Sequence, residues 1–177
     1  IVRKFHDWSD GGTLPIIIDA SSCTHGLLSG VPEVLDAETK QLYDELRIID
    51  IVEWLHDDVI DYLPIHHDMG TIAVHPACST QHMSHTDALV AVANRAGQAS
   101  VPFGAMCCGT AGDRGLLHPE LVESATREER TGLDARHYDA FVSSNRTCEM
   151  GLDVVAGYQF DSVAVLLEKA SRPVVTP

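Results

Sequence analysis

Short apolar segments alternate with segments of helical spacing along most of this chain. Apolar runs bounded by polar or turn-forming residues predict strands at 14–18, 71–74, 100–105 and 138–142. Apolar residues three and four positions apart predict helices at about 37–47, 52–63, 86–96, 118–130, 147–155 and 162–170. Residues 48–51 fit either a short strand or the start of the next helix. Strands that alternate with helices predict an α/β fold, in which a mainly parallel sheet has helices on both faces.

The chain has the length and composition of one globular domain. Its 177 residues, 45% of them hydrophobic and 21% charged, are enough to form a hydrophobic core that does not need disulfide bonds or metal ions to stabilise it. A glycine-containing segment at 10–13 separates an N-terminal arm, residues 1–13, from a domain that we expect to cover residues 14–177. The apolar runs are too short to predict a membrane span. Because the first residue is Ile1 and not Met, we expect this domain to be a fragment of a larger protein.

Charge and cysteine content limit the classes of function. The net charge of −14 is spread over the chain without a basic stripe, so nucleic-acid binding is not expected. Five cysteines, an odd number in a chain with a full-sized core, do not suggest a disulfide scaffold. They favour metal-binding or redox thiols in a reducing compartment, which predicts a cytoplasmic location.

Every cysteine follows the C-terminal end of a predicted strand. The five are Cys23, Cys78, Cys107, Cys108 and Cys148. The C-terminal ends of parallel strands meet at one edge of a sheet, where such folds build their sites. We therefore predict that the cysteine-bearing loops gather there around a cofactor. The alternative is that each cysteine is simply a small buried hydrophobic residue.

The residues near the cysteines sharpen this prediction. Glycines 109, 112 and 115 follow the cysteine pair and permit backbone N–H groups to point at one anionic centre. Asp113 and Arg114 lie among them, either at the mouth of the site or as an internal ion pair. Cys148 follows good helix-capping residues, so a first helical turn would favour its thiolate. Four histidines near the cysteine segments could bind zinc or serve structure, namely His25, His75, His82 and His118.

Five short sequence motifs together indicate a family resemblance that extends over about residues 14–170. They are DASSCT at 19–24, HPACS at 75–79, CCGTAGDRG at 107–115, HPEL at 118–121 and SNRTCE at 144–149. The chain resembles the cysteine-rich CCG domain of heterodisulfide reductases and of iron–sulfur subunits of glycolate and glycerol-3-phosphate dehydrogenases. It looks closer still to the C-terminal region of bacterial FAD-binding oxidases of the D-lactate or D-2-hydroxyglutarate dehydrogenase type.

This resemblance implies an iron–sulfur electron-transfer or accessory domain, with a 4Fe-4S cluster, in an FAD-linked enzyme acting on a D-2-hydroxy acid. The implied partners are a flavin domain and a ferredoxin-like domain of the same full-length protein, with a small-molecule electron acceptor or quinone. Neither domain is recognisable in this sequence, so the fragment alone is not expected to be catalytically complete or to bind FAD. The resemblance also allows a location at the inner face of the membrane.

The resemblance implies particular ligands. Cys78 matches the family's lone cysteine, Cys107 and Cys108 match its pair, and Cys148 matches the end of its final Cys-x-x-Cys. Asn145 stands where that last element has its first cysteine, and Cys23 is an outside replacement. His75, Asp113, Arg114 and Asn145 are the supporting residues. Two alternatives remain open: a structural zinc module that docks onto partner domains, and metal-free thiol–disulfide chemistry at the cysteine pair.

Overall fold

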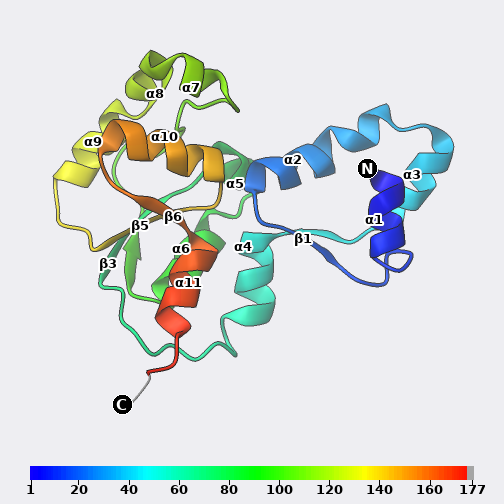
Figure 1. The fold of residues 1–177 in the computed structure, drawn as a ribbon, viewed down its shortest axis with the longest axis horizontal. Coiled ribbons are helices and arrows are strands. Elements are labelled where there is room, and N and C mark those ends of the chain that lie inside the picture. The colour runs from blue at the N-terminus through cyan, green and yellow to red at the C-terminus, as the bar shows by residue number, and fades with distance from the viewer. Residues whose placement is uncertain (175–177) are drawn as a thin grey trace.

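The computed structural model describes residues 1–174, so residues 175–177 of the predicted domain lie outside the described residues. The strands are β1 Ile16–Ile18, β2 Ile48–Asp50, β3 Thr71–His75, β4 Gln98–Ser100, β5 Ala140–Ser143 and β6 Phe160–Ser162. The α-helices are α1 Val2–Trp8, α2 Ser21–Ser29, α3 Ala37–Asp44, α4 Ile51–Trp54, α5 Cys78–His82, α6 Thr86–Asn94, α7 Arg114–Leu117, α8 Pro119–Ala125, α9 Arg127–Asp134, α10 Arg146–Ala156 and α11 Val163–Ser171. A 3₁₀ helix, Val31–Val34, follows α2, and a π-helical segment, Leu55–Val59, continues α4 (Figure 1).

The strands form two parallel sheets. The larger has the order β4-β3-β5-β6, and β1 pairs with β2 in a separate two-stranded sheet. The predicted α/β class with parallel strands is therefore confirmed, although we had expected one sheet. In the larger sheet the chain moves outward from β3 to β4 and then crosses back to β5 on the other side of β3. The order reverses between β3 and β5, which makes this position a topological switch point.

Several predicted boundaries are wrong. The strand expected at 100–105 ends at Ser100, and a loop follows, because Pro102 lacks a backbone donor and Gly104 has a φ of +78°. The helix expected at 118–130 is two helices, α8 and α9, divided at Thr126. Strand β6 and helices α2 and α5 were not predicted, because elements of three to nine residues leave little periodic signal.

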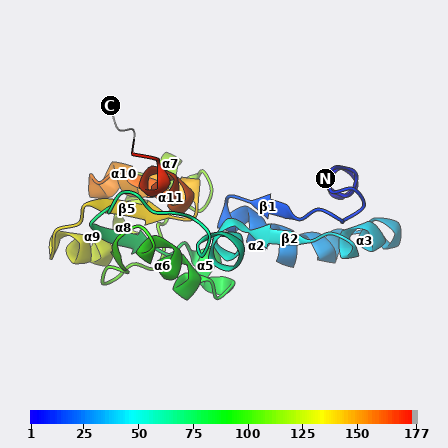
Figure 2. The ribbon, with the colours of Figure 1, turned by 90° about the horizontal axis from the view of Figure 1, so that it is seen from below.

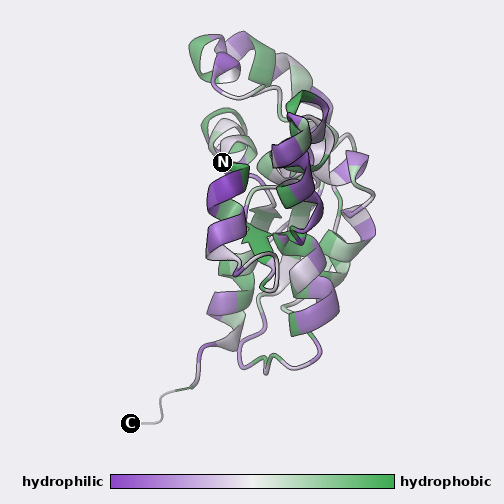
Figure 3. Cartoon of the chain, turned by 90° about the vertical axis from the view of Figure 1, so that its right-hand side faces the viewer, coloured by the Kyte–Doolittle hydropathy of each residue, from purple (hydrophilic) through white to green (hydrophobic). Residues whose placement is uncertain are grey.

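Side chains of the larger sheet alternate between two hydrophobic clusters. Ile72 and Val74 of β3 pack with residues of α4, α6 and α11 on one face. Ala73 faces the other cluster, which contains residues of α9 and α10 together with Cys108 and Cys148. Figure 3 shows hydrophobic strand segments inside, surrounded by more polar helices. Because side chains alternate along a strand, His75 lies on the same face as Ala73 and therefore on the face of these cysteines.

The N-terminal segment extends to one side of the larger sheet. Helix α1, within the predicted arm, packs against α3 beyond the β1–β2 pair (Figure 2). This segment is joined to the sheet edge by α2, where Ser21 N donates to the carbonyl oxygen of Ser144 at 3.1 Å. Within residues 1–174, no helix combines the length and apolar character needed to cross a bilayer.

Candidate metal centre

The loops after β3, β4 and β5 bring four cysteines to the switch point of the larger sheet. Cys78 begins α5 after β3, Cys107 and Cys108 follow β4, and Cys148 lies in the first turn of α10 after β5. Connections that leave neighbouring strands in opposite directions open a crevice at their C-terminal ends. The cysteine-bearing loops therefore lie where the topology makes room for a ligand.

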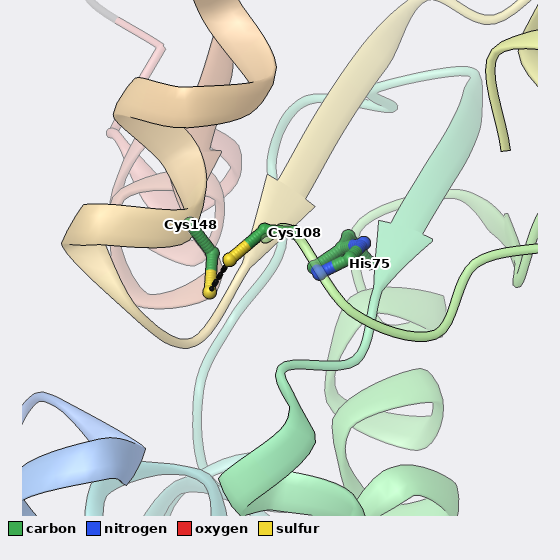
Figure 4. A group of neighbouring side chains, drawn as sticks. All are labelled: His75, Cys108 and Cys148. Atoms are coloured by element: carbon green, nitrogen blue, oxygen red, sulfur yellow. Dashed lines mark hydrogen bonds between the residues drawn. The ribbon is translucent and has the colours of Figure 1, made fainter. Parts of the chain in front are cut away.

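Cys108 and Cys148 are in direct contact. Their sulfur atoms are 2.8 Å apart, and both residues are buried, with exposed fractions of 4% and 3% (Figure 4). This distance exceeds the roughly 2.05 Å of a disulfide bond, and all five cysteines are free thiols. The contact therefore presents two adjacent sulfur donors to one point in space.

The groups around these sulfurs give the two thiols different pKa values. The contact with Cys148 lowers the pKa of Cys108 to about 4 against the opposing effect of burial, with help from His75 and from Thr110, whose Oγ1 is 2.7 Å from the sulfur. The same contact and burial raise the pKa of Cys148. Asn145 Nδ2 also donates to the Cys148 sulfur at 3.5 Å. The contact therefore favours the thiolate at Cys108 over Cys148, contrary to the expectation that the first helical turn favours a thiolate at Cys148.

His75 lies beside this pair and is held by a buried carboxylate. Its Nδ1 is 2.8 and 2.9 Å from the two carboxylate oxygens of Glu129, and both side chains are almost completely buried. One ring nitrogen and the sulfurs of Cys108 and Cys148 all lie within 4.8 Å of one another (Figure 4). Burial alone would lower the pKa of His75, but the contacts with Cys108 and Glu129 raise it to about 9. Nε2 has no hydrogen-bond partner in the described part of the chain.

Cys78 and Cys107 form the exposed side of the same edge. Burial raises the pKa of Cys78, as do the charges of Cys107 and Cys108. Cys107 accepts a hydrogen bond from Gly109 N at 3.4 Å. Cys78 is thus close enough to Cys107, Cys108 and Cys148 to interact with them electrostatically. Neither Cys78 nor Cys107 belongs to the compact His75–Cys108–Cys148 group among residues 1–174.

Cys23 lies on a different element at the margin of the site. It is exposed in the first turn of α2. The neighbouring Ser22 Oγ donates to Asn145 Oδ1 at 2.6 Å, which brings the start of α2 next to the Cys148 loop. Asn145 therefore joins the two segments and points its amide nitrogen at Cys148.

The other predicted supporting residues lie apart from the sulfur pair. Asp113 and Arg114 are exposed at the start of α7, and within residues 1–174 neither forms an ion pair or a side-chain hydrogen bond, so the alternative of an internal ion pair is not seen there. Their place at the mouth of the site stays a prediction. The rings of His25 and His82 are 5.6 Å apart, and His118 is exposed beside Glu120. Of the four candidate histidines, only His75 joins the group of sulfurs.

Sequence reasoning did not identify Glu129 or Thr110. Glu129 lies in the charged run 127–130, a pattern typical of a solvated helix face. Its neighbour Glu128 is indeed exposed, whereas Glu129 is 1% exposed and faces His75. Only the packing of α9 against the sheet distinguishes these two carboxylates.

The donor set fits a thiolate-bound metal centre. Soft sulfur ligands suit iron–sulfur clusters and zinc, and an imidazole nitrogen suits both metals. His75, Cys108 and Cys148 form the compact group of donors in the described part of the chain, and Cys78 and Cys107 on the same edge could complete the set. The buried contact of two sulfurs and the buried Nε2 without a partner are both features that a bound metal would satisfy.

Comparisons with known proteins point to a cysteine-rich domain. Residues 72–153 match the cysteine-rich domain family CCG, and this segment contains all four of those cysteines as well as His75, Glu129 and Asn145. The chain is 29% identical over 123 residues to the glycolate oxidase iron–sulfur subunit of Escherichia coli K12, with 68% of this chain and 30% of that protein covered. It is also 29% identical over 165 residues to a subunit of the anaerobic glycerol-3-phosphate dehydrogenase of Escherichia coli, in the K12 and O157:H7 strains, with 89% of this chain and 40% of each relative covered.

These relatives limit the resemblance inferred from the sequence. The chain spans 30–40% of the length of the curated relatives it matches. Their names refer to glycolate and glycerol-3-phosphate, so they support the cysteine-rich domain but not the narrower D-lactate or D-2-hydroxyglutarate branch. Residues 72–153 thus match the CCG cysteine-rich domain, and the chain is similar to subunits of two oxidoreductases, one of them an iron–sulfur subunit.

Proposed function

We propose that this chain is an iron–sulfur electron-transfer or accessory domain of an oxidoreductase. The observation that carries the proposal is the contact of the Cys108 and Cys148 sulfurs at the switch point, with Cys78 and Cys107 at the same edge. Cys78, Cys107, Cys108 and Cys148 would hold the cluster, with Cys23 in support. Such a cluster supplies one-electron transfer at a potential set by its charge, hydrogen bonds and exposure to solvent.

The chain's own residues prepare the site for this role. The Cys108 thiolate is already ionised at neutral pH and needs no deprotonation before it binds a metal. Thr110 and Asn145 place polar groups beside the sulfurs, and such hydrogen bonds tune a potential. The buried pair lies on the core side, whereas Cys78 and Cys107 face solvent, so electrons would enter or leave through the exposed side.

The complete enzyme would require further domains or subunits. We infer a flavin domain and a ferredoxin-like domain as partners, with an electron acceptor such as a quinone, in an FAD-linked dehydrogenase. Its substrate would be a 2-hydroxy acid, the chemical class to which the glycolate named for one relative belongs. D-lactate or D-2-hydroxyglutarate is the finer form of this proposal. Five free thiols favour a reducing location, the cytoplasm or the inner face of the membrane.

The second candidate is a structural zinc module that docks onto partner domains. It is favoured by one observation, the buried histidine beside two cysteines. Zinc sites combine cysteine and histidine ligands in a tetrahedral set and carry out no redox chemistry.

Metal and sulfide analysis of the anaerobically purified chain separates the two functions. Iron and acid-labile sulfide in similar amounts, with broad visible absorbance near ~400 nm that bleaches on reduction, would support the electron-transfer domain. A colourless chain that carries one zinc would overturn it and leave the docking module. Turnover of D-lactate, D-2-hydroxyglutarate or glycolate by the chain alone with an artificial acceptor would contradict the need for a separate flavin domain.

A further inference from the structure

His75 and Glu129 form a buried pair that the cysteine ligands alone do not explain. They lie 54 positions apart and have exposed fractions of 0% and 1%. The carboxylate directs both oxygens at one imidazole nitrogen. Burying two ionisable groups costs free energy that apolar residues of the same volume would avoid. A pair of this kind at the edge of a sheet, where sites form, suggests a role beyond packing.

The Nε2 atom of His75 is unusual for a buried polar atom. Nε2 is buried and, apart from the contact of the ring with the Cys108 sulfur, has no hydrogen-bond partner among the described residues. Buried polar atoms are nearly always satisfied, so an exception requires a physical reason. Because Glu129 engages Nδ1, Nε2 is the nitrogen available to a ligand, and a ring nitrogen lies within 4.8 Å of both buried sulfurs.

We propose that His75 is a nitrogen ligand of the centre held by Cys108 and Cys148, and that Glu129 orients it. This inference rests on the proposed function. Metal-bound histidines usually donate their other ring N–H to a carboxylate, which sets the tautomer and the direction of the ring. His75 and Glu129 have this arrangement.

The charges at the site are consistent with this arrangement. A metal bound at Nε2 would take the place of the proton on that nitrogen, as for other protein ligands of metals. Glu129 remains beside Nδ1 and balances part of the positive charge brought by the metal. Of the other three histidines near the cysteine segments, His118 is exposed in α8's N-cap and provides a chemically matched control.

Pulsed electron paramagnetic resonance of the loaded chain, prepared with ¹⁵N-labelled histidine, provides the direct test. We expect a strong hyperfine coupling from one directly bound nitrogen in a paramagnetic state of the centre. His75→Ala should abolish it, and His118→Ala should leave it unchanged. A loaded wild-type centre that shows only weak nitrogen couplings would overturn the ligand assignment while leaving the iron–sulfur proposal intact.

Metal content of purified variants gives an independent readout. His75→Ala should reduce the bound iron severalfold, and His75→Cys should restore it with an altered spectrum, because a thiolate replaces the imidazole. Glu129→Gln should retain iron but shift the spectrum and the reduction potential. Circular dichroism checks that each variant is folded.

His75→Ala with unchanged iron content and spectrum would defeat the inference. If the chain binds zinc, cobalt would be substituted for the zinc, and His75→Ala must then change the visible absorption bands of the bound cobalt. A chain that binds neither metal would overturn both proposals.

Discussion

Cys108 and Cys148 lie 40 positions apart in the sequence, and their sulfur atoms are 2.8 Å apart in the fold. One follows β4 and the other begins α10, so the contact depends on the crossover from β4 to β5 as well as on both loops. Thr110 and Asn145 bond to the two sulfurs from the same loops. The pair is therefore built by tertiary structure, and it gives the site a buried side.

Replacement of Cys108 by serine should abolish metal loading. Cys108 is buried in the centre of the sulfur group, and serine lacks the soft donor that iron requires. Cys23→Ser should retain most of the metal, because Cys23 is exposed on α2 and outside the segment that matches the cysteine-rich family. Iron and sulfide content per chain measures both effects. Equal losses in the two variants would instead make Cys23 a full ligand.

The metal-free chain should contain one thiolate far below the usual pH of thiol ionisation. The pKa of Cys108 is lowered to about 4, so this sulfur stays ionised as the pH falls from neutral and gains its proton only near that value. The ultraviolet absorbance of the thiolate, measured as the difference between wild type and Cys108→Ser, follows this step. Ionisation near the ordinary cysteine value of about 8.5 would contradict it.

Asp139 should make the free energy of unfolding decrease as the pH falls into the acid range. Its carboxylate accepts from Thr71 N and Thr71 Oγ1, each at 2.8 Å, and from His137 Nε2 at 2.9 Å. Chiefly the bond from Thr71 N lowers the pKa of Asp139 to about 2. Its contribution is thus present above the unfolded value of about 3.9 and is lost as the pH falls through about 2.

Urea unfolding at several pH values tests this effect. Asp139→Asn should flatten the loss of stability between about pH 4 and about pH 2. Asp61→Asn, which removes an exposed carboxylate elsewhere, should leave the slope as in wild type. If wild type, Asp139→Asn and Asp61→Asn all lose stability equally with falling pH, the acid sensitivity comes from other groups.

Gly109 should be more sensitive to alanine substitution than Gly112. Both have positive φ, +74° and +76°, which costs an L-residue about 1–2 kcal/mol. A Cβ at Gly109 would lie 2.7 Å from the carbonyl oxygen of Leu121 in α8, whereas one at Gly112 would meet nothing within 4 Å. Overpacking should add roughly 1–3 kcal/mol to the destabilisation at Gly109. Urea unfolding measures both variants, and equal losses would show that α8 moves aside freely.

The α/β class, and the sheet edge at which Cys78, Cys107, Cys108 and Cys148 lie, could be predicted from the sequence. Apolar periodicity identifies strands and helices locally, and parallel strands end at a common edge whatever their order. Position relative to a strand was therefore enough to place Cys108 and Cys148 together, with Cys78 close to them. The same reasoning placed the third strand at 100–105, whereas β4 ends at Ser100, because short strands carry little periodic signal.

Which of these side chains are in contact could not be predicted from the sequence and depends on the three-dimensional packing. The path of the loop through Gly109 turns Cys108 inward and leaves Cys107 exposed, although the two residues are adjacent. The alternation of side chains along β3 turns His75 toward the same face, and the packing of α9 turns Glu129, but not Glu128, toward His75. Such contacts depend on strand order, register and helix rotation, which are set by long-range packing and leave no local pattern in the sequence.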